Sequence, residues 1–144
     1  MNPTRAAAAG LIGTAVMTTL LLIEPSVGLP QIAMGQILST SLGSTSAHLP
    51  NGPAVGWLIN FFMGAVMALV YARFIVRVLP GNALARGAIF GVIVFVLAQV
   101  TFMPLVGGGV FSNGDPELLA GSLLGHLVYG ASMGWIYGEP ATTG

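Results

Sequence analysis

Cysteine and lysine are both absent from this 144-residue chain, and charged residues of all kinds make up only 6% of it. Without cysteine the chain has no disulfides, no thiolate zinc site, no cysteine-ligated iron–sulfur cluster and no cysteine nucleophile. The four basic residues, all arginine, balance four acidic ones, so the formal net charge is zero. Nucleic acids attract proteins with a surplus of positive charge, and the lack of one argues against nucleic acid as a partner.

Recognisable enzyme chemistry is also lacking. The run Gly107-Gly108-Gly109 is not a phosphate-binding loop, because no strand pattern precedes it and no lysine follows it. The apolar segments contain no acidic pair and no histidine-rich metal signature. We therefore expect a protein without enzymatic activity, catalytic residues or a metal site.

Apolar residues are what the chain has in excess. They make up 55% of it and give a mean hydropathy of +0.90. A soluble domain carries about 25% charged residues, so this chain could not cover its own surface with polar groups. The sequence therefore predicts an integral membrane protein whose first partner is the lipid bilayer.

Four apolar runs are each long enough for a helix across a hydrocarbon core of about 30 Å. They are residues 6–23, 53–76, 84–106 and 117–138. We expect one membrane domain, residues 1–144, with an all-α fold: a four-transmembrane-helix bundle. In the longest connection, residues 24–52, apolar and polar residues of segment 31–42 separate onto two sides of a helix. This segment is expected to form a short interfacial helix.

The arginines predict how the chain is oriented. Arg5 precedes the first run, and Arg73, Arg77 and Arg86 surround the connection between the second and third runs. With four spans these positions share one side of the membrane, which the positive-inside rule makes cytoplasmic. We therefore expect both termini in the cytoplasm, and the first and third connections outside.

The second and fourth runs resemble each other when residues 60–71 are aligned without a gap on residues 126–137. Four positions are identical: Gly64/Gly130, Ala65/Ala131, Met67/Met133 and Tyr71/Tyr137. Such a match is typical of two helix hairpins related by an axis along the membrane normal. Chance recurrence of common residues in apolar helices is the alternative, and both interpretations stay open.

Polar side chains are costly in hydrocarbon and tend to face protein or a cavity. Thr18, Asn60, Gln99 and His126 lie on four different runs, about 9 to 13 Å from their outer ends at 1.5 Å per residue. We expect them to converge under the outer connection. The expected polar cluster comprises Thr18, Glu24, Asn60, Gln99, Ser122, His126 and Tyr129.

Two roles for this cluster remain open. Interhelical hydrogen bonds of about 0.6–2 kcal/mol each would simply hold the bundle together. Alternatively, the cluster would bind a ligand such as a quinone headgroup, haem or metal, or line a path for protons or small solutes. Haem needs an axial ligand, and His126 is the only histidine in a span, so neither haem nor any other cofactor is favoured.

Small residues form ridges that suit close helix contact. These positions are Gly10, Thr14, Gly64, Gly87, Gly91, Gly130, Gly134 and Gly138. Because the ridges exceed what four short helices need for their own contacts, we expect some to dock another subunit or a second copy. The sequence thus favours a non-enzymatic accessory subunit of a larger membrane complex, for example a respiratory one, or a homo-oligomer. The alternative is a small-ligand-binding or transport protein built around His126.

Two motifs carry a resemblance. G-x-x-G-T-x-x-M, beginning at Gly10, and H-x-x-Y-G-x-x-x-G, beginning at His126, resemble the first and last helices of small prokaryotic four-span membrane proteins of unknown function. The similarity extends over most of the chain. It implies a multi-pass protein of a bacterial or archaeal cytoplasmic membrane, and it brings no catalytic residues.

Overall fold

The computed structural model of the chain describes residues 1–28, 52–105 and 107–138. Within these ranges all regular structure is helical and no strand occurs, as the sequence predicts. Four long helices dominate: α1 (Pro3–Ile23), α4 (Gly52–Val70), α5 (Ala83–Leu97) and α7 (Pro116–Tyr137). The interfacial helix expected at residues 31–42 lies outside the described residues.

Shorter segments extend or connect the long helices. They are the 3-10 turns η1 (Glu24–Val27) and η4 (Val110–Gly114), the π-helices η2 (Tyr71–Ile75) and η3 (Ala98–Phe102), and the short helix α6 (Met103–Leu105). The two π-helices continue α4 and α5 respectively, so both long helices widen by one residue per turn near their C-terminal ends.

Three helical stretches are long and apolar enough to cross a membrane: Pro3–Val27, Ala54–Ile75 and Ala83–Leu105. α7 is 22 residues long, but with its glycines, serines and histidine it does not reach the mean hydropathy of these three stretches. The chain is thus an all-helical protein compatible with a membrane.

Side-chain caps set the helix starts. The Asn2 side chain accepts a hydrogen bond from the Arg5 N–H at 3.0 Å, and Asn82 accepts from Ala85 N–H at 2.9 Å. Asp115 accepts from the first-turn N–H groups of α7 and is followed by proline at the favoured first position. Because of these caps, the helices begin one to three residues before the starts expected from the apolar runs.

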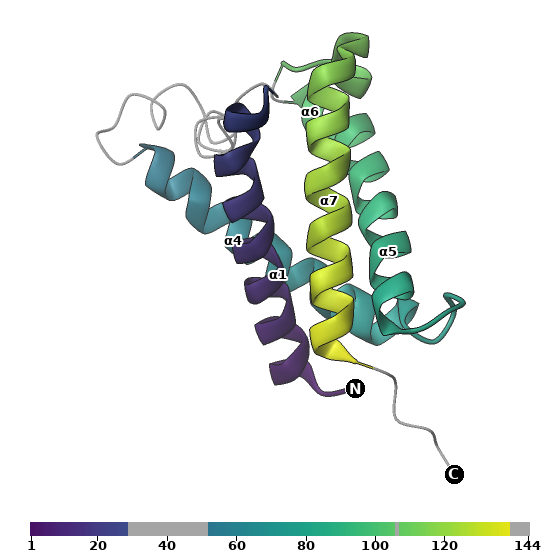
Figure 1. Cartoon of the computed structure of the whole chain (residues 1–144). Coiled ribbons are helices and arrows are strands. Elements are labelled where there is room, and N and C mark those ends of the chain that lie inside the picture. The colour runs from purple at the N-terminus through teal and green to yellow at the C-terminus, as the bar shows by residue number, and fades with distance from the viewer. Residues whose placement is uncertain (29–51, 106, 139–144) are drawn as a thin grey trace.

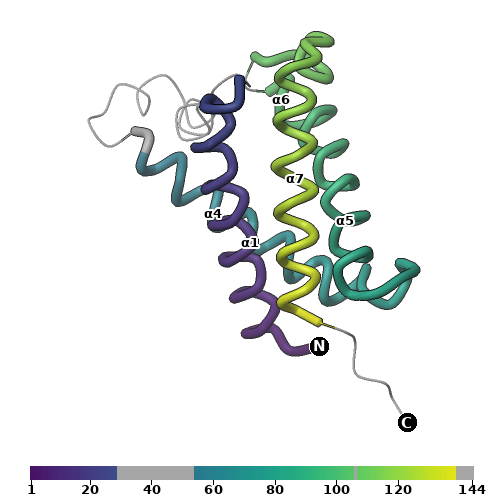
Figure 2. Tube along the Cα trace, in the orientation of Figure 1, coloured from purple at the N-terminus to yellow at the C-terminus, as the bar shows by residue number. Residues whose placement is uncertain are grey.

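α7 lies at the centre of the arrangement (Figure 1). It packs against α1 on one side and α5 on the other, and both run antiparallel to it. α4 crosses the others obliquely and packs mainly against α1 (Figure 2). The start of α1 and the end of α7 therefore meet at one end of the bundle.

Backbones approach closely where α5 meets α7. A Cβ on Gly87 would overlap the Gly130 carbonyl oxygen, and one on Gly91 would overlap the His126 carbonyl oxygen. On the α7 side, a Cβ on Gly134 would stand 2.6 Å from the Gly87 Cα. We call the contact made by Gly87, Gly91, Gly130 and Gly134 the α5–α7 seam.

A second close approach joins α1 to α4. A Cβ on Gly10 would stand 2.9 Å from the Ala65 Cα, and a Cβ on Gly64 would overlap the Thr14 hydroxyl. Thr14 donates that hydroxyl to the Gly10 carbonyl at 2.8 Å. We call this contact the α1–α4 crossing. The glycines of the seam and the crossing pack against other helices of the same chain. They therefore offer no free ridge to a second subunit.

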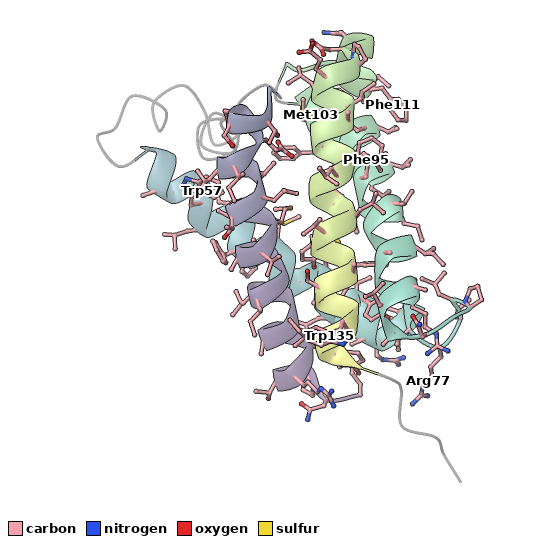
Figure 3. All side chains as sticks on the ribbon, in the orientation of Figure 1. Trp57, Arg77, Phe95, Met103, Phe111 and Trp135 are labelled. Carbon is pink, nitrogen blue, oxygen red and sulfur yellow. The ribbon has the colours of Figure 1, made fainter. Side chains whose placement is uncertain are left out.

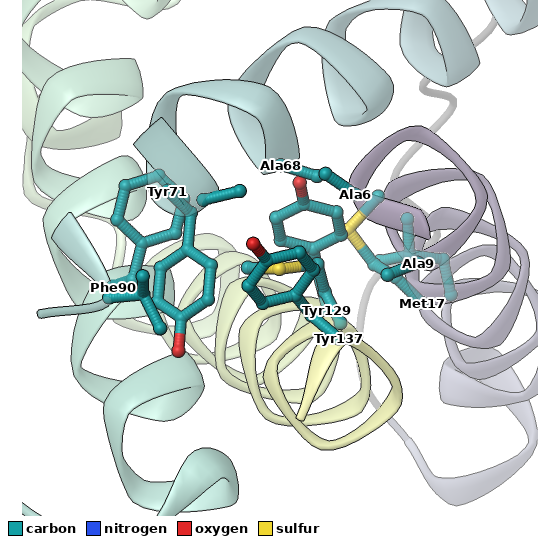
Figure 4. Close-up of a cluster of buried hydrophobic side chains, with 12 residues drawn as sticks. Ala6, Ala9, Met17, Ala68, Tyr71, Phe90, Tyr129 and Tyr137 are labelled. Carbon is teal, nitrogen blue, oxygen red and sulfur yellow. The ribbon is translucent and has the colours of Figure 1, made fainter. Parts of the chain in front are cut away.

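An aromatic cluster fills the space between α4, α5 and α7 (Figure 4). The Tyr71 ring centroid lies 5.2 Å from that of Phe90 and 6.0 Å from that of Tyr137. The outward faces are also apolar: Leu58, Phe62 and Trp135 are each about two-thirds exposed or more. Apolar residues both inside and outside are the pattern of a helix bundle in lipid.

Charge is segregated between the two ends. Arg5 bonds the Ile136 carbonyl at the end of α7, and Arg77 lies in the turn between η2 and α5, at the same end (Figure 3). We call this the arginine end, because Arg73 and Arg86 flank the same turn. Glu24, Asp115 and Glu117 lie at the opposite end, which we call the acidic end.

Candidate functional site

Gln99 is the centre of a hydrogen-bond network near the acidic end. It lies in the π-helix η3 and is 1% exposed. Its Nε2 donates to the Ser122 hydroxyl at 3.1 Å, and its Oε1 accepts from the Ser112 hydroxyl at 3.0 Å. One amide thereby joins the extension of α5 to α7 and to the turn η4, and both ends of the amide are satisfied.

His126 is held by its own helix. Its Nδ1 lies 2.7 Å from the Ser122 carbonyl oxygen, one turn earlier in α7. A carbonyl oxygen only accepts, so Nδ1 is the donor and Nε2 of the neutral ring is an acceptor. The ring meets Phe95 of α5 edge-on, with centroids 5.8 Å apart. His126 therefore belongs to the α5 side of α7.

Tyr129 links α7 to α4. Its hydroxyl donates to the Gly64 carbonyl oxygen at 2.6 Å, and the side chain is buried (Figure 4). The bond reaches the α1–α4 crossing, where Gly64 leaves its carbonyl accessible. Tyr129 thus ties helices together, and its hydroxyl is not directed at the Gln99 network.

Three predicted residues have buried polar atoms without a hydrogen-bond partner among the described residues. They are both carboxylate oxygens of Glu24, the hydroxyl of Thr18 and the amide nitrogen of Asn60. Glu24 is 1% exposed. A buried polar atom left unpaired costs about 1–3 kcal/mol, and an unpaired charge costs more. We call these three side chains the unpaired group.

The helix register places Thr18 and Asn60 on the same side of the α1–α4 crossing. Thr18 follows Thr14 by one turn, and Asn60 precedes Gly64 by one turn. Since α1 and α4 run in opposite directions, both residues lie toward the acidic end (Figure 1).

Glu24 lies on the side of α1 that meets α7. It follows Met17 by seven residues, which is two helical turns, and so shares its face. A Cβ on Gly125 of α7 would stand 3.5 Å from the Met17 Cγ. Glu24 is thus about 10 Å beyond this contact, at 1.5 Å per residue, where α1 ends.

The structure therefore divides the seven predicted residues. Hydrogen bonds join Gln99, Ser122 and His126, whereas Tyr129 bonds to α4. Thr18, Glu24 and Asn60 form the unpaired group on α1 and α4. The sequence predicted that all seven side chains converge on one centre. The hydrogen bonds do not join all seven, because α7 lies between α1 and α5.

Sequence reasoning did not single out Ser112. Its position depends on three successive non-glycine residues, Phe111, Ser112 and Asn113, with φ of 47°, 50° and 53°. This left-handed turn costs about 1–2 kcal/mol per residue, and it directs the buried Ser112 hydroxyl at Gln99. No composition signal marks a left-handed turn that lacks glycine at its centre.

A Gly-x-Ser-x-Gly pattern, the spacing of a serine-hydrolase nucleophile turn, occurs at residues 130–134. That chemistry needs a sharp turn from a strand into a helix. Here the pattern lies inside α7, and Ser132 donates to the Val128 carbonyl at 2.7 Å, as helical serines do. The pattern arises from helix packing.

Metal-ligating side chains do not assemble in the described ranges: no three residues among His, Asp and Glu come together there. Gly138, the last of the expected small-residue positions, ends α7 with φ of +80° beside the Arg5 guanidinium. Its role is to terminate the helix.

Helices that are apolar outside, packed on glycine inside and long enough to cross a membrane define an all-helical, membrane-compatible bundle. Within that class, the model of a family of unknown function, DUF6789, matches residues 1–143, and the chain belongs to this family. No curated protein and no solved structure matches the chain.

Proposed function

We propose that this protein is a non-enzymatic, four-span integral membrane protein that binds a small polar ligand at the buried Glu24 carboxylate. The observation that carries the proposal is the Glu24 carboxylate, which is 1% exposed and has no hydrogen-bond partner in the described part of the chain. Carboxylates at membrane depth are rare and mark ligand, ion or proton sites.

The energetics favour a ligand over a purely structural role. A structural polar group stabilises a bundle only through the bonds it makes, as Gln99 does with two serines. The buried polar atoms of Glu24, Thr18 and Asn60 make no such bonds with the described residues. Each buried polar atom without a partner lowers the stability of the fold. A ligand that completes the hydrogen bonds of the Glu24 carboxylate would recover this free energy when it binds.

Four spans follow if α7 crosses together with the three more apolar helices. Its length matches theirs, and it is covered by α1 and α5 on two sides, so its glycines and polar residues meet protein. The arginine end would then be cytoplasmic by the positive-inside rule. Both termini would face the cytoplasm of a prokaryotic cell, with the unpaired group in the outer half of the membrane.

The test is to release the protein from its own membrane in mild detergent and to weigh it intact by native mass spectrometry. We expect a bound small molecule or ion on the wild type and on Glu117→Gln, and its loss from Glu24→Gln. Glu117 is the matched control because it is exposed at the same end. Identical bound species on all three proteins would contradict the proposal.

An accessory subunit or homo-oligomer is the second candidate. The glycine ridges no longer argue for it, but α4 does, because it packs mainly against α1 and leaves Leu58 and Phe62 exposed. Lipid or a protein partner would cover this face. The native mass in mild detergent separates the two, since a monomer without associated chains would exclude the subunit role.

A further inference from the structure

If Glu24 binds a ligand, as proposed above, the charges around its carboxylate indicate the charge of that ligand. All four arginines lie at the arginine end, in or beside the first turn of α1 and the turn between η2 and α5. α7 alone separates the two ends by about 33 Å, at 1.5 Å per residue. At that distance no guanidinium forms an ion pair with the Glu24 carboxylate, because a salt bridge needs the two groups within about 4 Å.

The helix itself makes the position more negative. Glu24 is the residue that follows the last turn of α1 and begins the 3-10 turn η1, so it lies near the C-terminal end of this helical stretch, where the helix dipole is negative. A carboxylate at this end is opposed by the dipole, whereas a cation is favoured by both. An anionic ligand would meet two like charges and no compensating base.

The other titratable side chains that the structure describes near the acidic end do not change this balance. Asp115 accepts two N–H groups as the cap of α7, and Glu117 is exposed; both are acidic. On α7, His126 directs Nδ1 to its own helix and packs its ring on Phe95. Tyr129 donates to Gly64. None of these four groups supplies a positive charge to the unpaired group.

We infer that the ligand of Glu24 is a small cation, either an alkali metal ion or a protonated amine. The Glu24 carboxylate supplies the charge and two buried oxygens without hydrogen-bond partners. Carboxylate oxygens are among the donors that hard cations and ammonium groups prefer.

The experiment measures thermal unfolding of the full chain in detergent, with four chloride salts compared at constant ionic strength. These are sodium chloride, potassium chloride, methylammonium chloride and choline chloride, the last serving as the bulky reference. Glycerol at matched concentrations tests a neutral solute, and sodium phosphate against sodium chloride tests an anion. Wild type is compared with Glu24→Gln and with the control Glu117→Gln.

We expect at least one of sodium, potassium or methylammonium to raise the unfolding temperature of wild type and Glu117→Gln relative to choline. In Glu24→Gln the apparent affinity for that cation should fall about tenfold or more, because a buried charge partner is removed. The identity of the active probe distinguishes a metal ion from an amine. Thr18→Val, which keeps the charge and the shape, should weaken the same response less.

Two results would overturn the inference, and they differ in what else they refute. A Glu24-dependent response to glycerol or phosphate, with none to the cations, would reject a cation and leave the ligand site standing. Equal responses of wild type and Glu24→Gln to every probe would reject both the cation and the proposed ligand site. The amide of Glu24→Gln keeps the size of the side chain, so a loss of folding is not expected to obscure either result.

Discussion

The α5–α7 side and the α1–α4 side of this bundle differ in whether their buried polar side chains have hydrogen-bond partners. On the first, the helices meet glycine on glycine, and Gln99 has a partner for each end of its amide. On the second, α4 crosses α1 obliquely, and Thr18 and Asn60 keep buried atoms without partners, as does Glu24 on the face of α1 that meets α7. Complete packing and complete hydrogen bonding therefore occur together. The unpaired atoms lie on α1 and α4, away from the α5–α7 seam, and this is the reason to expect function there.

The largest expected effect comes from filling the seam. In Gly130→Val, the added Cβ alone would lie 2.7 Å from the Gly91 Cα, and the two methyl groups need still more space. Moving two backbones apart should destabilise the protein by about 3 kcal/mol or more, beyond ordinary overpacking. Unfolding in a denaturing detergent series measures this. Val92→Leu, on the exposed face of α5, is the control and should change stability little.

Removing the central amide should have the next largest effect. Gln99→Leu keeps the volume but leaves the Ser112 and Ser122 hydroxyls without their shared partner. We expect a loss of about 1–3 kcal/mol, measured in the same unfolding series. An unchanged stability would show that the network contributes nothing, and the contrast between the two sides would then disappear.

Two threonines on one face of α1 give the sharpest comparison. Thr14 donates its hydroxyl to Gly10, whereas the Thr18 hydroxyl is buried and unpaired. Thr14→Val should therefore cost about 1 kcal/mol, and Thr18→Val should be neutral or slightly stabilising in protein stripped of ligand. Equal losses in both variants would mean that Thr18 has a partner after all.

The smallest effect concerns the left-handed turn. Asn113 has φ of 53°, which glycine adopts without strain. Asn113→Gly should stabilise the protein by up to about 1 kcal/mol, whereas Asn113→Val should destabilise it, because a β-branched residue tolerates positive φ worst. Thermal unfolding of the pair checks the sign; the opposite order would contradict the left-handed assignment.

The helices could be predicted because their signals are local. Apolar runs gave their existence and approximate bounds, and Asn2, Asn82 and Asp115 are recognisable caps that explain the remaining one to three residues. The shared end of the arginines also followed from the runs alone, since helix count and order decide which connections are neighbours.

The site was only partly predictable, because its geometry depends on how helices meet. The depths of Gln99 and Thr18 along their helices were sound arguments for convergence. However, depth does not say that α7 stands between α1 and α5, nor that Gly10 and Gly64 set an oblique crossing. The π-helix around Gln99 and the left-handed turn around Ser112 likewise depend on tertiary contacts that no single-residue preference encodes.

One contact at the arginine end has a practical consequence. Arg5 donates both Nε and Nη2 to the Ile136 carbonyl oxygen, at 3.3 and 3.2 Å, so the first turn of α1 touches the last turn of α7. A short peptide could therefore join residue 138 to residue 2 without disturbing any helix. Opening the resulting ring at Gly114, between η4 and α7, would yield a circular permutant with α7 leading the chain. Its new ends would emerge beside the acidic end, where a fluorescent label could report on ligand binding at Glu24.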